Sequence, residues 1–296
     1  MTYLLLSIAI LSSGLSGNVY KRLSGKSLSP AMSALYPALW FFPLAVVFFI
    51  GMALGGNPLA VLVKPALLWP AMGGGFGLTL AASILIESMK RNSMAISVIL
   101  VNLNFVIPVL LSTIFLQEQS GWLQMAGMVL CIVVIVLINF KKEKGQGGAK
   151  VALLLPCAAC LANGAVNFCI KLHQNQMGDA SLNAFYALMY LFSGLFCLLF
   201  WVVLRSRSQQ ILPGSKAAWV SVLTDAVMLG LCNGICFYMT GLLAGRMNAA
   251  AQFTLLTASS IALSLFVGAV FQKARITLKT VLSFLFCLLA IFLEAF

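Results

Sequence analysis

The sequence has very little charge for its length. Only 8% of its 296 residues are charged, and six of those are acidic, while 62% are hydrophobic. Soluble domains carry about 25% charged residues, so this chain cannot cover a globular surface facing water. Its apolar runs are long and continuous, unlike the short alternating segments of a transmembrane β-barrel. The composition therefore predicts an all-α integral membrane protein, with lipid around most of its surface.

The sequence also lacks the residues that most enzymes and metal sites need. It has one histidine, His173, and no HExxH motif, P-loop or dinucleotide fingerprint. Its eight cysteines lie inside apolar runs, where cysteine behaves as a small hydrophobe. No cysteine pair has a histidine or a third thiol beside it, as a zinc site would. We expect no catalytic residues, no metal and no cofactor.

Ten apolar runs approach or exceed the roughly 20 residues that a helix needs to cross the hydrocarbon of a bilayer. Pro30 and Pro65 lie next to the starts of two of them, where a missing amide donor does no harm. Gly73 and Gly77 form a small-xxx-small pair, which predicts close helix packing, with a hinge as the alternative. The runs lie at 3–20, 31–54, 66–89, 93–117, 121–139, 151–171, 182–204, 217–244, 247–270 and 277–295.

The basic residues indicate an orientation. Of the 18 lysines and arginines, fifteen fall in the odd-numbered connections between runs, and only Lys64, Lys171 and Arg246 fall on the other side. Basic loops stay in the cytoplasm, so both termini are predicted to face outward in a multi-pass protein of the plasma (inner) membrane. The net charge of +12 therefore reflects topology, and no nucleic-acid partner is expected.

The two halves of the chain resemble each other weakly. A polar, basic tract at 141–150 separates a first repeat at 1–140 from a second at 151–296. Because each predicted half has an odd number of helices, the second must be inverted relative to the first, which is a recurrent transporter design. A shift of 150 positions lays Leu4, Gly14 and Lys21 on Leu154, Gly164 and Lys171, and a shift of 155 lays Arg91 and Ala95 on Arg246 and Ala250.

The segment from Pro108 to Glu118, followed by Gly121 and Gly127, resembles the EamA-type branch of the drug/metabolite transporter superfamily. That family has a proline-containing fourth helix ending in an acidic residue, followed by a glycine-bearing helix. The resemblance implies ten helices in two inverted five-helix repeats, with helices one to four and six to nine around a central cavity. It also implies export of amino acids and related metabolites. Many members keep both termini in the cytoplasm, whereas the charges here favour the opposite.

Polar side chains within the apolar runs are the candidate substrate-binding residues. An unpaired polar group in hydrocarbon is costly, so such residues are functional candidates by default, with an interhelical hydrogen bond as the alternative. As a set, the amides, hydroxyls and aromatic rings suggest a cavity for a neutral or zwitterionic solute. The candidates are Asn102, Asn104, Asn163, Asn167, Tyr186, Tyr190, Asn233, Gln252 and Thr257.

Two carboxylates are candidates for proton coupling or gating. Glu87 lies near the predicted cytoplasmic end of the third run, and Lys90 or Arg91 could pair with it in a structural ion pair. Asp225 lies about two turns into the eighth run and has no partner nearby in sequence. Small multidrug exporters of the wider superfamily use a glutamate in the first helix, but the first and sixth runs here contain no carboxylate.

The sequence thus favours a secondary transporter that exports small polar metabolites such as amino acids, by alternating access between inverted repeats. A flippase for lipids or lipid-linked carriers with the same fold is the alternative, and a membrane-embedded enzyme is the least favoured function. The expected partners are a small-molecule substrate and membrane lipid, and no obligate protein partner is evident.

Overall fold

The computed structural model describes residues 2–24, 29–56, 58–91, 101, 103–119, 121–139, 149–205, 216–270 and 278–295. Within these ranges the chain forms helices and no strand. The helices are α1 (Thr2–Ser24), α2 (Pro30–Leu35), α3 (Ala38–Leu54), η1 (Leu59–Val63), α4 (Pro65–Arg91), η2 (Leu103–Phe105), α6 (Val106–Phe115), α7 (Trp122–Asn139), α8 (Ala149–Met177), η3 (Asp179–Ser181), α9 (Leu182–Arg205), α10 (Lys216–Ala244), α11 (Ala249–Val270) and α12 (Leu278–Ala295).

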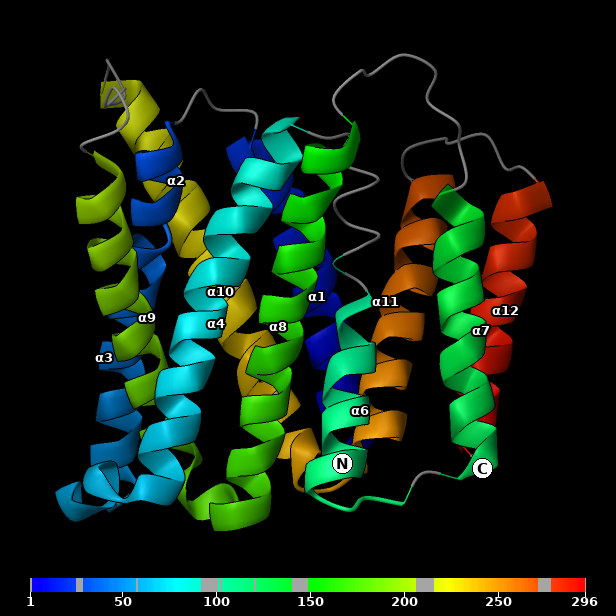
Figure 1. Cartoon of the computed structure of the whole chain (residues 1–296), viewed down its shortest axis with the longest axis horizontal. Coiled ribbons are helices and arrows are strands. Elements are labelled where there is room, and N and C mark those ends of the chain that lie inside the picture. The colour runs from blue at the N-terminus through cyan, green and yellow to red at the C-terminus, as the bar shows by residue number, and fades with distance from the viewer. Residues whose placement is uncertain are drawn as a thin grey trace.

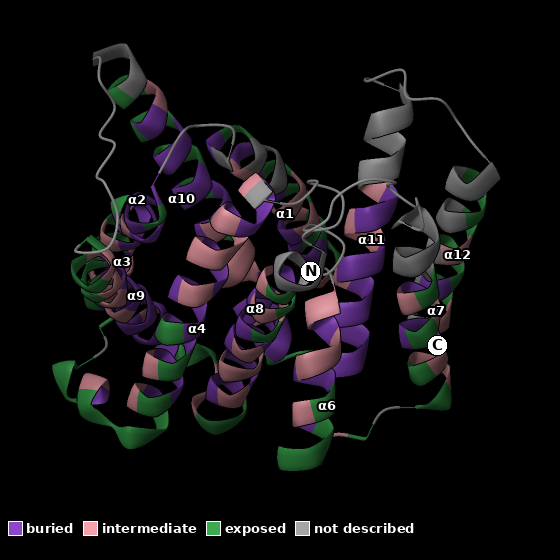
Figure 2. Cartoon of the chain, turned by 45° about the horizontal axis from the view of Figure 1, so that its top comes forward, coloured by how far each residue is buried: buried purple, intermediate pink, exposed green. Residues whose placement is uncertain are grey.

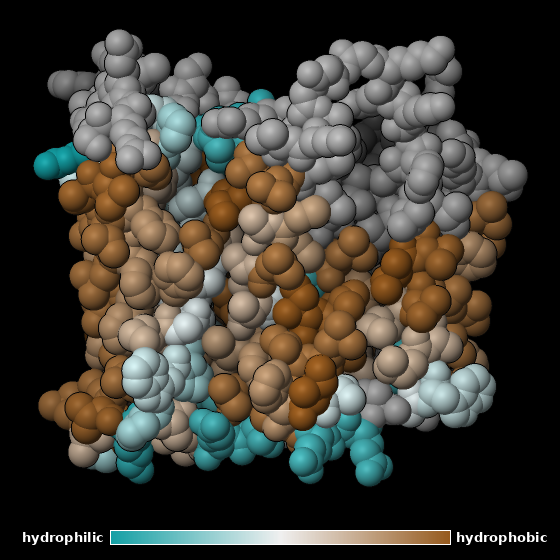
Figure 3. Space-filling view, viewed as in Figure 1, coloured by the Kyte–Doolittle hydropathy of each residue, from teal (hydrophilic) through white to brown (hydrophobic). Residues whose placement is uncertain are grey.

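The prediction of an all-α membrane protein is confirmed. Each of the ten apolar runs contains a helix, and five helices in the described part of the chain are long and apolar enough to cross a bilayer. Figure 3 shows a band of hydrophobic surface with hydrophilic residues gathered along one edge, as a protein surrounded by lipid requires. The first part of the run at 93–117, and the predicted linker at 141–150 apart from the start of α8, lie outside the described residues.

The run at 31–54 forms one candidate membrane span, Pro30–Leu54, which a turn at Tyr36 and Pro37 divides into two helices. Ser29 caps α2 by accepting a hydrogen bond from the Met32 amide at 3.3 Å, and Pro30 occupies the first turn. The helix then ends at Leu35, and α3 begins at Ala38 after a turn through Tyr36 and Pro37. Proline has no amide hydrogen and cannot continue the ladder of helical hydrogen bonds, which accounts for the break.

The helices run side by side, with the start of α1 and the end of α12 at the same end of the bundle (Figure 1). We call this the termini end. We call the opposite end the basic end, because α1, α4 and α9 finish there beside Arg22, Arg91 and Arg205. The most extensive helix contacts join the two halves of the chain: α4 packs on α8 and α9, α1 on α10, α3 on α9 and α7 on α12.

The glycines of α4 allow its neighbours to approach closely. A Cβ at Gly77 would lie 3.0 Å from the Ala162 carbonyl of α8. A Cβ at Gly75 would lie 2.8 Å from the Met189 carbonyl of α9. Both distances are too short for a side chain, so the prediction of close helix packing at Gly77 is confirmed.

The buried residues gather where these helices meet. Figure 2 shows that buried residues follow α11 and that exposed residues occur on α7 and α12, which form a pair at one side of the bundle. Large aromatic side chains fill the interface of α3 with α9, among them Trp40, Phe41, Tyr186 and Tyr190, each at most 2% exposed. The core therefore lies between the two halves of the chain.

Candidate functional site

A cavity of about 200 Å3 lies between the two halves. Five helices contribute to its wall, namely α1, α4, α8, α10 and α11, together with η2. No charged side chain lines it within the described residues. Of the predicted substrate-binding residues, five line this cavity: Asn104, Asn163, Asn167, Asn233 and Thr257.

The asparagines project into the cavity from three elements. Asn163 and Asn167 lie one turn apart on α8, so they share a face of the helix. The Asn167 amide approaches the Asn104 side-chain oxygen at 3.5 Å, and the Asn233 amide approaches the Tyr20 hydroxyl at 3.4 Å. Both distances are longer than those of a typical N–H···O hydrogen bond, so these amides are only weakly engaged with each other. They are available to a bound solute.

The rest of the wall is apolar. Leu78 and Leu85 of α4, Phe237 of α10 and Phe253 and Leu256 of α11 line the same space as the asparagines. A cavity that combines a few converging polar groups with apolar walls is typical of small-molecule sites. Because it offers uncharged donors and acceptors, it matches a neutral or zwitterionic solute with an apolar part.

The other predicted cavity residues lie elsewhere. Tyr186 and Tyr190 are completely buried and pack against Phe48, at ring-centroid distances of 5.3 and 5.6 Å, so they belong to the α3–α9–α10 core. Gln252 is also buried and donates a hydrogen bond to the Thr240 carbonyl at 2.7 Å, which joins α11 to α10. Asn102 lies outside the described residues.

Two helices that the resemblance placed around the cavity contribute no lining residue in the described part of the chain. These are α3 and α9, and the aromatic core between them fills the space that a cavity would need. Conversely, the cavity wall includes Tyr20 and Thr240, which sequence reasoning missed. Tyr20 lies at the predicted end of its run beside Lys21, where a tyrosine is typical of the membrane–water interface. A single threonine in an apolar run does not indicate a cavity, because its hydroxyl can donate to a carbonyl of its own helix, as Thr240 does to Cys236.

Both candidate gating carboxylates have basic partners. Glu87 pairs with Lys90 at 3.2 Å within α4, as their spacing predicts. Asp225 has no basic residue nearby in sequence, and it pairs with Arg22 of α1, which reaches it from the other half of the chain at 3.2 Å. The Asp225 side chain is 1% exposed and that of Arg22 is 65% exposed. Long-range pairing of this kind cannot be read from the spacing of residues along one helix.

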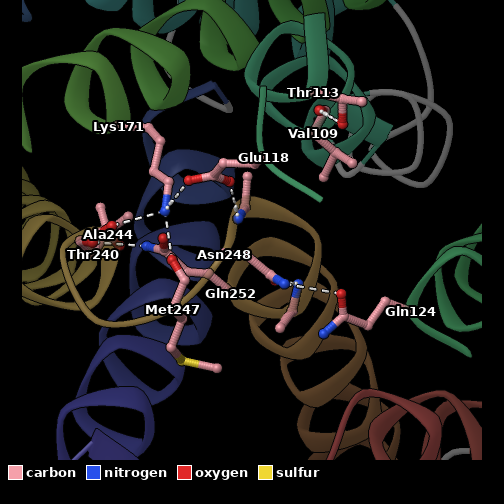
Figure 4. A network of polar contacts seen from close by, with 12 residues as sticks. Val109, Thr113, Glu118, Gln124, Lys171, Thr240, Ala244, Met247, Asn248 and Gln252 are labelled. Carbon is pink, nitrogen blue, oxygen red and sulfur yellow. Dashed lines mark hydrogen bonds and ion pairs between the residues drawn. The ribbon is translucent and has the colours of Figure 1, made fainter. Parts of the chain in front are cut away.

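A second ion pair between the halves lies at the termini end (Figure 4). The Lys171 ammonium group lies 2.9 Å from the Glu118 carboxylate, and the two side chains are 4% and 21% exposed. Sequence reasoning placed Lys171 in a connection, but α8 continues to Met177, so this lysine is a buried helical residue. The residues after Lys171 are polar, among them His173, Gln174 and Asn175. The predicted apolar run therefore stops before the helix does.

The two charges also complement helix ends. Lys171 donates to the carbonyls of Ala244, at 2.8 Å, and Met247, at the end of α10. Glu118 accepts from the amide of Ala249, the first residue of α11, at 2.8 Å. A cation at a helix C-terminus and an anion at a helix N-terminus are each favourable, since the helix dipole and the unpaired backbone groups have the opposite sign. One ion pair thus fixes the turn between α10 and α11 against the first half.

The backbone just before Glu118 directs its side chain toward Lys171. Gln117, two residues beyond the end of α6, has a φ of 54°, and the Glu118 amide that follows donates back to the Ser112 carbonyl at 3.4 Å. Nearby, Asn248 donates to the Gln124 side chain of α7 at 2.9 Å and accepts from the Ala251 amide. These contacts tie the α10–α11 turn to both α6 and α7. Within the described residues, no group of three or more metal-ligating side chains lies together.

Comparisons with known proteins agree with this architecture. The EamA-like transporter family matches residues 1–140. The predicted resemblance is therefore confirmed, and the match indicates a membrane transporter of the drug/metabolite type. A solved crystal structure with 18% sequence identity covers 99% of this chain and 95% of its own, with a TM-score of 0.70, which shows a shared fold. No curated protein matches the sequence.

Proposed function

We propose that this chain, whose first 140 residues match the EamA-like transporter family, is a secondary transporter that exports small polar metabolites such as amino acids. The observation that carries the proposal is the central cavity, whose lining is uncharged and comes from both halves of the chain. Its asparagine and hydroxyl groups can hydrogen-bond the head of a zwitterion, while its leucine and phenylalanine side chains accept an apolar side group. We propose no catalytic activity for it.

The size of the cavity favours a small solute over a lipid. Sites for drug-sized ligands occupy roughly 300–1,000 Å3, whereas this cavity occupies about 200 Å3. A lipid or lipid-linked carrier would also need a continuous polar path open to the bilayer for its head group. The flippase function is therefore the weaker alternative.

Helix pairing supports alternating access between inverted repeats. If the two halves are related by a two-fold axis, α1 corresponds to α8, α4 to α10, α3 to α9 and α7 to α12. Under this symmetry the α4–α8 contact is equivalent to the α10–α1 contact. The α3–α9 contact and the α7–α12 contact each join two corresponding helices. These four pairings are among the five most extensive contacts between the halves, and the fifth, α4 with α9, has no equally extensive counterpart. Contacts of this kind support repeats that exchange conformations around a central site.

Ion pairs between the halves lie on either side of the cavity. Arg22 and Asp225 join α1 to α10 toward the basic end, and Lys171 and Glu118 join α8 to the end of α6 at the termini end. Access from one side requires the halves to separate at that end. We propose that each pair closes its own end, and that they separate in alternation.

Flux measurements test the proposal. Purified protein in proteoliposomes is loaded with amino acids, amines, sugars and nucleosides in turn, and gradient-driven efflux is measured. We expect Asn163→Leu to lower flux of the transported solute about tenfold, because a solute hydrogen bond is replaced by an unsatisfied polar group. The matched control is Thr224→Ala, because Thr224 is exposed and bonds only its own helix, to the Val220 carbonyl. Absence of flux for every solute class in the unaltered protein contradicts the proposal.

The orientation of the chain needs a separate test. We propose that the termini face outward and the basic end faces the cytoplasm of a cell whose plasma (inner) membrane holds the protein. A reporter enzyme that is active only outside the cytoplasm, fused after Phe296, should be active. Activity of a cytoplasm-specific reporter at the same position would show the opposite orientation.

A further inference from the structure

A second cavity, of about 380 Å3, lies at the termini end. Its wall is formed by the residues after α6, the last turns of α8 and the turn between α10 and α11. It shares no lining residue with the central cavity, although Thr240 lines one and Ala244, a turn further along α10, lines the other. We call it the vestibule. Unlike the central cavity, it has charged residues in its wall, namely Lys171, Glu118 and Arg246.

The vestibule contains a buried amide with no partner. Gln174 is 5% exposed, and neither its side-chain oxygen nor its side-chain nitrogen has a hydrogen-bond partner. A buried carboxamide left in this state is destabilising, because it loses its bonds to water and gains none in return. The Gln174 oxygen lies 3.1 Å from the position that a Cβ on Gly245 would occupy, so a glycine at 245 leaves space beside the Gln174 amide.

The neighbouring charges do not satisfy Gln174. Lys171 directs its three protons at Glu118 and the carbonyls of Ala244 and Met247, and an ammonium group has no fourth proton to donate. Each Glu118 oxygen already has a partner, one in Lys171 and the other in the Ala249 amide. The hydrogen-bonding capacity of the Gln174 amide is therefore left for a molecule that enters the vestibule.

The chemistry of the wall indicates what that molecule carries. A carboxamide offers one acceptor and two donors, so its complement has both a donor and an acceptor. Arg246 approaches Asp179 only at 3.7 Å, and the two side chains are 32% and 48% exposed, which leaves guanidinium donors for a carboxylate. A molecule with a carboxylate and an ammonium group on the same carbon atom fits this arrangement of positive, negative and amide groups.

We propose that the vestibule is a second binding site for the zwitterionic head of an amino acid. Gln174 and Arg246 bind the carboxylate, and the Gln174 oxygen accepts from the ammonium group. The site lies outside the Lys171–Glu118 pair, so it holds the solute at the termini end while that pair keeps the central cavity closed. The inference rests on the proposed function, because it assigns the same solute class to a second point on the transport path.

Calorimetric titration of the whole protein in lipid nanodiscs tests the inference. The probes are L-alanine, L-serine and L-glutamine, with propionate and n-propylamine as compounds that carry only one of the two charged groups. We expect two binding events per chain for at least one amino acid, and binding of propionate and n-propylamine to the vestibule about tenfold weaker. Gln174→Met should remove one event, and Asn163→Leu should remove the other.

A second variant and a stability measurement separate binding from folding. Gly245→Ala places a methyl group against the Gln174 amide without removing any polar group, and it should weaken the same event as Gln174→Met. Thermal unfolding of Gln174→Met should occur no earlier than that of the unaltered protein, because methionine leaves no unpaired polar atoms. Loss of one binding event in a protein of unchanged stability supports the site.

The outcomes also distinguish this inference from the proposed function. If the unaltered protein shows a single event that Asn163→Leu abolishes, or if Gln174→Met and Gly245→Ala titrate like the unaltered protein, the vestibule holds only water and the inference is overturned. Gradient-driven flux would remain in that case, so the proposed function would survive. Loss of flux for all solutes would instead refute the transporter itself.

Discussion

Replacing Lys171 by methionine should strongly destabilise the protein, because Lys171 is a buried charge. The substitution keeps an unbranched side chain in α8 and removes the ammonium group. It leaves the Glu118 carboxylate without its counter-charge and the carbonyls of Ala244 and Met247 without a donor. The Glu118–Ala249 and Asn248 contacts would still join the turn between α10 and α11 to the first half.

The size of the effect follows from burial. Breaking a buried ion pair by removing one partner costs about 3–5 kcal/mol. Glu118 is 21% exposed and keeps the Ala249 amide, so water can reach part of the remaining charge. We therefore expect a loss near the lower limit, about 3 kcal/mol. The control is Arg246→Met at the same end of the bundle, whose loose, exposed pair should contribute less than about 1 kcal/mol.

The measurement is equilibrium unfolding in mixed micelles with increasing SDS, followed by circular dichroism, for four proteins that form a double-mutant cycle. Glu118→Gln keeps an acceptor for Ala249 but removes the negative charge. In the cycle, the cost of the orphaned carbonyls appears in both proteins that lack Lys171 and cancels. We expect a coupling energy between Lys171 and Glu118 of about 1–3 kcal/mol. A Lys171→Met protein as stable as Arg246→Met, or additive effects in the cycle, would refute a structural link between the halves here.

Three further substitutions give separate tests. Gly75→Ala should lower the free energy of unfolding by about 1–3 kcal/mol through overpacking, since its Cβ would lie 2.8 Å from a backbone oxygen of α9. Its control is Gly121→Ala, whose Cβ meets open space and which should leave the free energy of unfolding unchanged. Gln252→Leu should change the free energy of unfolding by no more than about 1 kcal/mol, because it removes one hydrogen bond but also one unpaired acceptor. It should leave the KM for flux unchanged, and a raised KM would show that Gln252 contacts the solute. Asp225→Asn should leave the protein folded but alter flux, because it removes the charge that joins α10 to Arg22; unaltered flux would exclude the pair from gating.

The transmembrane segments could be predicted because their signal is local. About 20 apolar residues in succession specify a membrane helix wherever it packs, and the predicted ends agree with the observed helices closely at α4 and α9. The signal failed where a helix continues in polar residues, as α8 does beyond Lys171 to Met177. It also failed to show the break at Pro37, because a turn inside an apolar run leaves mean hydropathy unchanged.

The site could be predicted only in part. Asparagines at mid-helix positions line the cavity because they are costly elsewhere in a membrane, so Asn163, Asn167 and Asn233 carried a signal. Tyrosine carries less, since its ring packs in a core as readily as beside a solute, and Tyr186 and Tyr190 proved to be core residues. Pairings such as Lys171 with Glu118 depend on tertiary structure and cannot be read from one helix.

The uncharged wall of the central cavity has an electrical consequence. A unit charge carried across a membrane exchanges about 2.3 kcal/mol with each 100 mV of potential. A cavity that carries no charged side chain among its described lining residues, and that holds a solute of zero net charge, exchanges none of that energy when its access changes sides. Movement of the solute through such a cavity would carry no net charge, so this step would continue in a cell whose membrane potential had collapsed.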